Sequence, residues 1–397
     1  FAEDKGVGCV VPAMPAAGAL QEVPTLPDPF VGMDGQALTT KDQWRCRRQE
    51  IKALGETFIY GAKPAKPASV TGTVSDTSIT VDVQGPAGPV SFTASITLPP
   101  GATGPVPAVI GYGGSAFQQA MADEGVAFIN YDVATVGDET TRNPKVGAFY
   151  AANPDRQSTG MLVAWAWGVS RMIDVIEASG SQIIDPTGIG VHGCSRSGKG
   201  AFIAGAFDER VALTIPFESG MAGVPAFRFI VREGGEVLRN AIQYRPWAGD
   251  AYQQFLQLTA QQSDTAGLAQ DNVVSGQMQA KLPIDTHEVI GMVAPRGLLV
   301  LGNPGIVNLA PDSEHITVLA GAEIYSAIGA RENISYISNT TNGQHCSFRE
   351  EFVPQLQANL RKFLKKDASA TTGAFEADPR LAGQLAPNIA WTTPTLQ

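Results

Sequence analysis

The spacing of hydrophobic residues changes twice within the first hundred positions. Residues 1–40 are rich in Pro, Gly and Ala without periodicity, which predicts an extended N-terminal arm laid over a core. Residues 41–60 carry apolar side chains at helical spacing and predict the first helix. Between 69 and 98 the period falls to two, which predicts antiparallel hairpin strands broken at 75–76 and 85–88.

After Pro99, short and continuously apolar runs alternate with helical stretches. Such runs suit the buried parallel strands of an α/β sheet. The predicted strands are 106–112, 126–131, 188–193, 212–217, 297–302 and 334–337. The predicted helices are 160–178, 198–207, 286–292 with Asp285 and Glu288 as its capping box, and 354–365. No repeat or linker interrupts the pattern, so we expect one domain over residues 1–397 with a mostly parallel central sheet.

Composition narrows the possible partners. The 397 residues carry a formal net charge of −10 and a pI near 5.0, which argues against nucleic acid and anionic membranes. No apolar stretch approaches the roughly 18–20 residues that span a bilayer. Sequons at Asn333 and Asn339, together with low charge, favour a secreted glycoprotein. We expect a monomer, with a processed N terminus because the chain starts at Phe1 without methionine.

The segment Gly193-Cys194-Ser195-Arg196-Ser197-Gly198-Lys199 follows an apolar strand and opens a helix. A strand-to-helix turn of this kind holds a nucleophile clear of the sheet, and the helix N terminus can stabilise an oxyanion. The pattern is one residue longer than the usual nucleophile elbow, and a plain surface serine is the alternative. We expect Ser195 to be the nucleophile of an α/β-hydrolase, a three-layer sandwich with an antiparallel N-terminal hairpin extension. The Gly-rich segment 111–115 is the expected second contributor to the oxyanion hole.

Four histidines allow the general base to be chosen by elimination. His192 lies in a buried strand and points away from the serine, His287 lies in the first turn of a capped helix, and His315 lies in a loop of unassigned position. His345 follows the strand 334–337 and precedes the last helix, where the hydrolase order Ser…acid…His puts the base. We therefore expect His345 to be the base.

The acid has two candidate positions. Glu218 ends the strand 212–217, at the carboxyl edge where site residues gather in open α/β sheets. The commoner hydrolase position lies one strand later, where Asn303, Asp312 and Glu314 fall in a predicted loop. Because its strand places it tightly, we favour Glu218.

The four cysteines allow three disulfide connectivities. If nucleophile and base are within hydrogen-bond reach, Cys194 and Cys346 come close enough for a disulfide, which leaves Cys9 with Cys46. Free buried thiols are the alternative. A Cys194–Cys346 disulfide would lock nucleophile and base together.

The serine segment, 165–171, 294–298 and the tail 391–396 resemble the glucuronoyl esterases of carbohydrate esterase family 15, fungal branch, and the similarity extends from about residue 25 onward. These enzymes cleave esters between (4-O-methyl-)glucuronic acid on xylan and lignin alcohols. The resemblance implies a triad of Ser195, His345 and Glu218 and a disulfide beside Ser and His. It further implies that Arg196 supports the oxyanion and that Lys199 contacts sugar hydroxyls. Surface charge on an exposed helix start is the alternative for both cations.

The sugar subsite departs from the family pattern. Fungal members carry a Gln and a Glu before a Pro-Trp pair, and anchoring on Pro246-Trp247 puts Glu236 and Tyr244 at those places, with Gln243 as a substitute. The family's sugar-stacking Trp after the late strand is missing, and Asn308 is the nearest residue. A third family disulfide has no cysteines here.

The sequence therefore predicts a serine esterase acting on (4-O-methyl-)glucuronate esters of glucuronoxylan and lignin through a glucuronoyl-enzyme intermediate. An acetyl or feruloyl esterase with the same triad is one alternative, and a non-catalytic carbohydrate-binding descendant is the other. We expect no cofactor and no metal, because the histidines lack ligand spacing.

Overall fold

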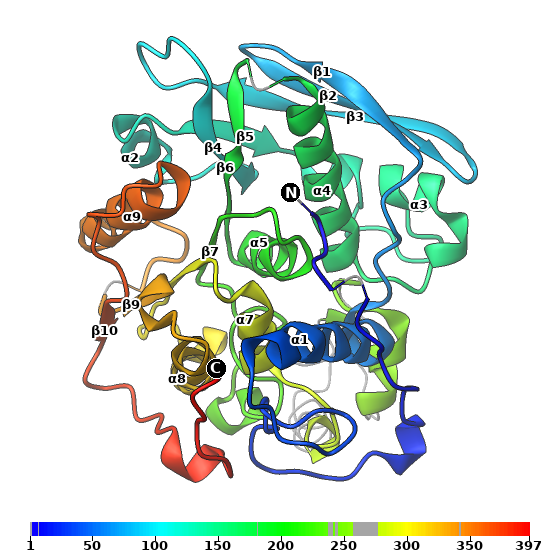
Figure 1. The fold of residues 1–397 in the computed structure, drawn as a ribbon, viewed down its shortest axis with the longest axis vertical. Coiled ribbons are helices and arrows are strands. Elements are labelled where there is room, and N and C mark those ends of the chain that lie inside the picture. Colours follow the sequence, from blue (N-terminus) through cyan, green and yellow to red (C-terminus); the bar gives the residue numbers. More distant parts are fainter. Residues whose placement is uncertain are drawn as a thin grey trace.

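A ten-stranded sheet forms the centre of the computed structural model, which describes residues 2–6, 8–180, 182–236, 241–242, 245–256, 277–340 and 343–397 (Figure 1). The strand order is β1-β2-β3-β5-β4-β6-β7-β8-β9-β10. The strands are β1 (Ser69–Val74), β2 (Ser78–Gly85), β3 (Gly88–Thr97), β4 (Val106–Tyr112), β5 (Ala127–Tyr131), β6 (Ile184–Cys194), β7 (Leu213–Phe217), β8 (Gly297–Leu301), β9 (Ile334–Ser338) and β10 (Phe375–Ala377).

The sheet has two parts that match the two hydrophobic periods of the sequence. β1, β2 and β3 pair antiparallel, and β3 joins the rest antiparallel to β5. Ile79, Val81 and Val83 of β2 are buried between more exposed neighbours, as a one-sided hairpin requires. From β4 to β10 all neighbours are parallel, and β7, β8 and β9 are buried along their whole length.

Helices cover both faces of the sheet, so the fold is the predicted three-layer α/β-hydrolase sandwich. In Figure 1, α2 and α9 lie on one side and α4, α5 and α7 on the other. β4 shows why both faces are apolar: Ala108 and Ile110 join the larger core, and Val109 joins the core under α2 and α9. The helices are α1 (Lys41–Gly55), α2 (Gln118–Asp123), α3 (Ala148–Ala152), α4 (Met161–Ala178), α5 (Arg196–Phe207), α7 (Thr286–Val293), α8 (Pro311–Ala327) and α9 (Val353–Asn359), and α1 and α9 each continue as a π-helical turn.

The N terminus of α7 is capped by residues next to it in the sequence, whereas the N terminus of α8 is capped by a residue far away in the sequence. The predicted capping box of α7 is confirmed, with Asp285 and Glu288 in reciprocal contact. The loop predicted around His315 is wrong, because those residues form the first turns of α8. The N-cap of α8 is Ala310, which offers no side-chain acceptor. Glu233 supplies the acceptors instead, 2.7 and 2.6 Å from the first backbone amides of the helix.

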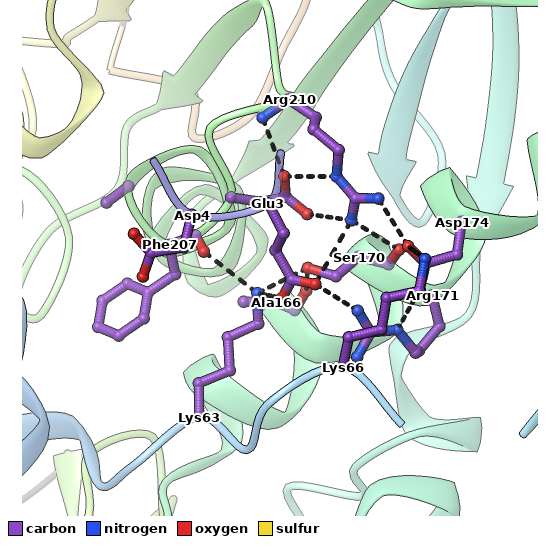
Figure 2. Close-up of polar contacts among 12 residues, drawn as sticks. Glu3, Asp4, Lys63, Lys66, Ala166, Ser170, Arg171, Asp174, Phe207 and Arg210 are labelled. Carbon is purple, nitrogen blue, oxygen red and sulfur yellow. Dashed lines mark hydrogen bonds and ion pairs between the residues drawn. The ribbon is translucent and has the colours of Figure 1, made fainter. Parts of the chain in front are cut away.

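The N-terminal arm is fastened to the body at its first residues. Glu3 enters a buried cluster of cations and lies 2.6 Å from Lys63 Nζ and 2.5 Å from Arg171 Nη2 (Figure 2). The disulfide Cys9–Cys46, with Cα atoms 5.2 Å apart, then ties the arm to α1. Across the described ranges, no helix combines the length and apolar character needed to cross a membrane.

Candidate active site

Ser195 joins β6 to α5 in a backbone conformation that L-residues rarely adopt, with φ 60° and ψ −128°. Its N–H donates to the carbonyl oxygen of Phe217 in β7 at 2.9 Å. A Cβ on Gly198 would lie 2.8 Å from that same oxygen, and one on Gly193 would lie 2.3 Å from the carbonyl oxygen of Ser197. The flanking glycines are therefore required by close approach of the backbone, and the serine is held on a strained turn.

The carboxylate of Glu218 accepts four hydrogen bonds. Oε2 receives Nδ1 of His345 at 2.6 Å and the backbone N–H of Cys346 at 2.7 Å. Oε1 receives Nδ2 of Asn303 at 2.9 Å and Nη2 of Arg349 at 2.7 Å. Burial alone would raise the pKa of Glu218, but these four donors lower it below its ordinary value. Glu218 is therefore ionised at neutral pH.

The ionised partner defines the proton arrangement of His345. An anionic carboxylate at 2.6 Å requires the proton on Nδ1, so Nε2 presents its lone pair. The His345 side chain is 39% exposed, so part of it faces solvent although Nδ1 is held by Glu218. The described residues provide no hydrogen bond between this imidazole and the Ser195 hydroxyl.

A disulfide joins the two segments instead. Cys194 and Cys346 are bonded with Cα atoms 5.7 Å apart, which is the pairing predicted from the sequence. Ser195, Glu218 and Cys346 all have positive φ, at 60°, 45° and 60°. Strained non-glycine residues cluster at functional sites because the surrounding structure over-determines them. Their concentration here supports this location as the candidate active site.

Arg196 occupies the first position of α5. Its guanidinium is half exposed and its Nη1 lies 2.6 Å from Oε1 of Glu139. In the predicted oxyanion loop, the N–H of Gly113 donates to the carbonyl oxygen of Tyr131 at 3.0 Å. That amide is already satisfied, so any oxyanion contact from the loop has to come from another of its groups.

Lys199 is buried beside the serine turn, which excludes the alternative of a surface charge on an exposed helix. Its Nζ lies 2.8 Å from Oε2 of Glu236 and donates to the carbonyl oxygen of Ser219. The ammonium also lies 4.9 Å from the ring centroid of Trp247. Burial lowers the pKa of Lys199 while Glu236 opposes that effect.

The structure brings most of the predicted sugar subsite together. The backbone N–H of Glu236 donates to the carbonyl oxygen of Asn308 at 2.9 Å, so Lys199, Glu236 and Asn308 are neighbours. Asn308 itself is exposed. The predicted residue Tyr244 and its substitute Gln243 lie outside the described residues.

The other three histidines lie within elements of secondary structure, namely β6, α7 and α8. His192 is buried in β6, with Nδ1 3.1 Å from the carbonyl oxygen of Ile215. His287 is buried in α7 and stacks on Trp391 of the C-terminal tail. His315 lies in α8.

One cluster offers atoms of metal-ligand type, but its chemistry does not suit a metal. One such atom each from Cys194, Glu218, His345 and Cys346 lies within 4.8 Å of the others. The two sulfurs are bonded to each other and cannot act as thiolates, and Nδ1 of His345 is engaged by the carboxylate. The same atoms suit a hydrogen-bonded base and acid.

Sequence reasoning missed three residues of this site. Asn303 was considered only as a replacement for the acid, whereas its amide donates to that acid. Arg349 follows His345 by four positions, and the only signal in the sequence was a cation so near the predicted base. Glu139 had no local signal, because it lies 57 positions from the Arg196 that it contacts.

Comparisons with known proteins identify the family of this chain. The family described as glucuronyl esterase, fungi, matches residues 79–329. A 4-O-methyl-glucuronoyl methylesterase of Hypocrea jecorina is 33% identical over 395 residues, covering 98% of this chain and 80% of the relative. One of Schizophyllum commune is 34% identical over 383 residues, covering 94% and 91%.

Solved structures show the same likeness in three dimensions. The glucuronoyl esterase catalytic domain of Hypocrea jecorina superposes with a TM-score of 0.84 at 34% identity, covering 98% of this chain and all of that one. A mutant glucuronoyl esterase of Sporotrichum thermophile, in complex with methyl 4-O-methyl-β-D-glucopyranuronate, gives 0.81 at 34% identity, covering 95% and 97%. The chain therefore belongs to the fungal glucuronyl esterase family, a family of carboxylic ester hydrolases with the α/β-hydrolase fold.

Proposed function

We propose that this protein is a secreted, monomeric serine esterase that hydrolyses esters of (4-O-methyl-)glucuronic acid, such as those linking glucuronoxylan to lignin. One observation carries the proposal: the strained Ser195 turn is joined by a disulfide to the segment of His345, whose Nδ1 faces Glu218 at 2.6 Å. This is the arrangement that nucleophilic acyl transfer needs.

The reaction proceeds in two steps. Ser195 Oγ attacks the carbonyl carbon at C6 of the uronate ester while Nε2 of His345 takes its proton. His345 returns this proton to the departing alcohol, which leaves the glucuronoyl group esterified to Ser195. A water molecule then attacks the carbonyl carbon of that ester while His345 takes its proton, and His345 passes this proton to Ser195 Oγ as the glucuronate leaves. Glu218 orients the imidazole and stabilises its cation.

Charge on the attacked oxygen develops beside the start of α5. The helix N terminus and the guanidinium of Arg196 stabilise this charge, which is greater in the transition state than in the ester. Two of the three N–H groups of Lys199 are used by Ser219 and Glu236. Within the described part of the chain the third N–H has no hydrogen-bond acceptor, and we propose a sugar hydroxyl as its partner, on this side of Ser195.

The names of the relatives support a uronate as the acyl group. The matched relatives are 4-O-methyl-glucuronoyl methylesterases, and the matched Sporotrichum thermophile structure holds a methyl 4-O-methyl-glucuronate. Two disulfides support an oxidising, extracellular compartment. A single peak at the monomer mass in gel filtration would support the monomer.

Substrate choice is tested with purified full chain. Methyl and benzyl glucuronate, with and without the 4-O-methyl group, are compared with acetyl and feruloyl esters of sugars. We expect cleavage of the uronates. Cleavage of acetyl esters with none of the uronates would refute the substrate assignment.

The nucleophile is tested separately with Ser195→Ala. We expect a folded protein with hydrolysis reduced by at least about 10⁴-fold. Ser197→Ala, two positions along the same helix, is the matched control and is expected to retain activity. Retained hydrolysis in Ser195→Ala would remove Ser195 from the mechanism.

A further inference from the structure

The carboxylate of Glu139 connects two elements that flank Ser195. Its Oε1 accepts a hydrogen bond from Nη1 of Arg196 at 2.6 Å, and its Oε2 accepts one from Nε1 of Trp247 at 2.5 Å. The Glu139 side chain is 14% exposed and Trp247 is buried, so the contact with the indole is largely shielded from water. One carboxylate thus contacts both Arg196, at the start of α5, and Trp247.

The backbone that carries Glu139 is anchored on both sides. The N–H of Asp138 donates to the carbonyl oxygen of Val146 at 3.0 Å, and the Asp138 carboxylate accepts the N–H of Thr140 at 2.9 Å. The carbonyl oxygen of Gly137 accepts Nε1 of Trp165, from the buried helix α4, at 2.7 Å. Glu139 is therefore fixed by the core and can impose a position on its partners.

Arg245 Nε also lies 3.9 Å from Oε1 of Glu139, but the hydrogen-bonded partners are Arg196 and Trp247, and these two differ in how much they need such support. The Arg196 side chain is 52% exposed, and without a partner a long guanidinium side chain samples many rotamers in water. Trp247 is buried, and its ring faces the ammonium of Lys199 at 4.9 Å. Glu139 therefore reaches Arg196 directly and Lys199 through one indole ring.

We infer that Glu139 is a positioning residue that holds the guanidinium of Arg196 beside the attacked carbonyl and sets the indole plane behind Lys199. The inference rests on the proposed function in one respect, since it takes Arg196 to stabilise the oxyanion. A guanidinium already in place loses no conformational freedom when the charge develops, so its contribution falls mainly on kcat.

Glu139→Gln tests the inference by a double-mutant cycle with Arg196→Ala, using benzyl glucuronate and the full chain. We expect Glu139→Gln to lower kcat about tenfold, since a misplaced group can cost up to about a hundredfold. KM should change by less than about twofold, because the glutamine side chain retains an acceptor oxygen for the Trp247 indole. Arg196→Ala should lower kcat about a hundredfold. The double variant should be no slower than Arg196→Ala.

A matched control separates positioning from general loss of an ion pair. Glu124 is 11% exposed and pairs with Arg361 at 2.9 Å and Lys365 at 3.7 Å, away from the site. Glu124→Gln should leave kcat unchanged. If Glu139→Gln keeps the wild-type kcat, or if its effect multiplies with that of Arg196→Ala, the inference is overturned.

The outcome for Glu139 is distinct from the outcome for the substrate. A wild-type enzyme that cleaves only acetyl esters would refute the proposed substrate. The same cycle, run on the acetyl ester, still decides the role of Glu139, because either ester develops an oxyanion at the same place.

Discussion

Replacing Glu3 with Gln should destabilise the folded protein by about 3 kcal/mol at pH 7. Burial alone would raise the pKa of Glu3, but Lys63, Arg171 and Arg210 lower it from its ordinary value of 4.5 to about 2. A tenfold change in a protonation equilibrium corresponds to about 1.4 kcal/mol. The ionised carboxylate therefore binds its cations in the folded state with about 3 kcal/mol of net free energy.

The contacts of Lys63 show why the loss is large. Its Nζ lies 2.6 Å from Oε1 of Glu3, 2.7 Å from Oγ of Ser170 and 3.1 Å from the carbonyl oxygen of Phe207 (Figure 2). Of these three acceptors, only the carboxylate of Glu3 carries a negative charge. Without it, the buried ammonium keeps only neutral acceptors, and removing one partner of a buried charge pair is strongly destabilising.

The effect also has a definite pH dependence. The folded-state pKa of Glu3 lies below its unfolded value, so its stabilisation is complete above about pH 5 and is lost as the pH falls towards about 2. The stability difference between wild type and Glu3→Gln should therefore shrink from pH 7 to pH 3. At still lower pH, wild-type Glu3 is protonated and resembles glutamine.

Equilibrium unfolding in urea, with both disulfides intact and followed by tryptophan fluorescence, measures these differences. Asp155→Asn is the control, since Asp155 is 67% exposed and pairs with Arg156 on the surface. It should change stability by less than about 0.5 kcal/mol. A Glu3→Gln effect below about 1 kcal/mol at pH 7, or one unchanged at pH 3, would refute the reasoning.

Three further substitutions test the site and its surroundings. Gly198→Ala places a methyl group 2.8 Å from the carbonyl oxygen of Phe217, so kcat should fall about a hundredfold, and an unchanged kcat would contradict the required close approach. Arg349→Met removes a hydrogen bond that holds the carboxylate of Glu218, so His345 should be less well oriented and kcat/KM at pH 7 should fall about tenfold; an unchanged kcat/KM would show that Arg349 does not support this acid. Burial raises the pKa of Glu314 to about 8, and the nearby carboxylates of Glu218 and Glu233 add to this effect. As the pH rises from about 4.5 towards 8, this carboxyl ionises in the unfolded state but not in the folded state, so the free energy of unfolding of the wild type decreases. Glu314→Gln should match wild type at pH 5 in urea unfolding and exceed it at pH 9, and equal stability at both would argue against the raised pKa.

The sequence by itself determined the elements whose signals are local. The strand predicted at 106–112 is β4 with the same bounds, and Asp285 with Glu288 caps α7 as predicted. A strand's alternation, a capping box and a Gly-flanked serine each depend on residues a few positions apart, so neighbours in the sequence are sufficient to specify them. The cysteines allowed one prediction about residues far apart in the sequence. Cys194 is next to Ser195 and Cys346 is next to His345, so a disulfide between them requires the serine and the histidine to lie near each other.

Only the tertiary structure decided which charged groups meet. Glu233 caps α8 from 79 positions away, Glu139 contacts Arg196 across 57 positions, and Glu3 reaches Arg171 across 168. A charged side chain has the same local pattern whether its partner is water, a nearby residue or a distant one. Its burial and pKa follow from the surfaces that folding brings together, and no periodicity encodes those. The donors around Glu218 and the support behind Arg196 are therefore properties of the fold.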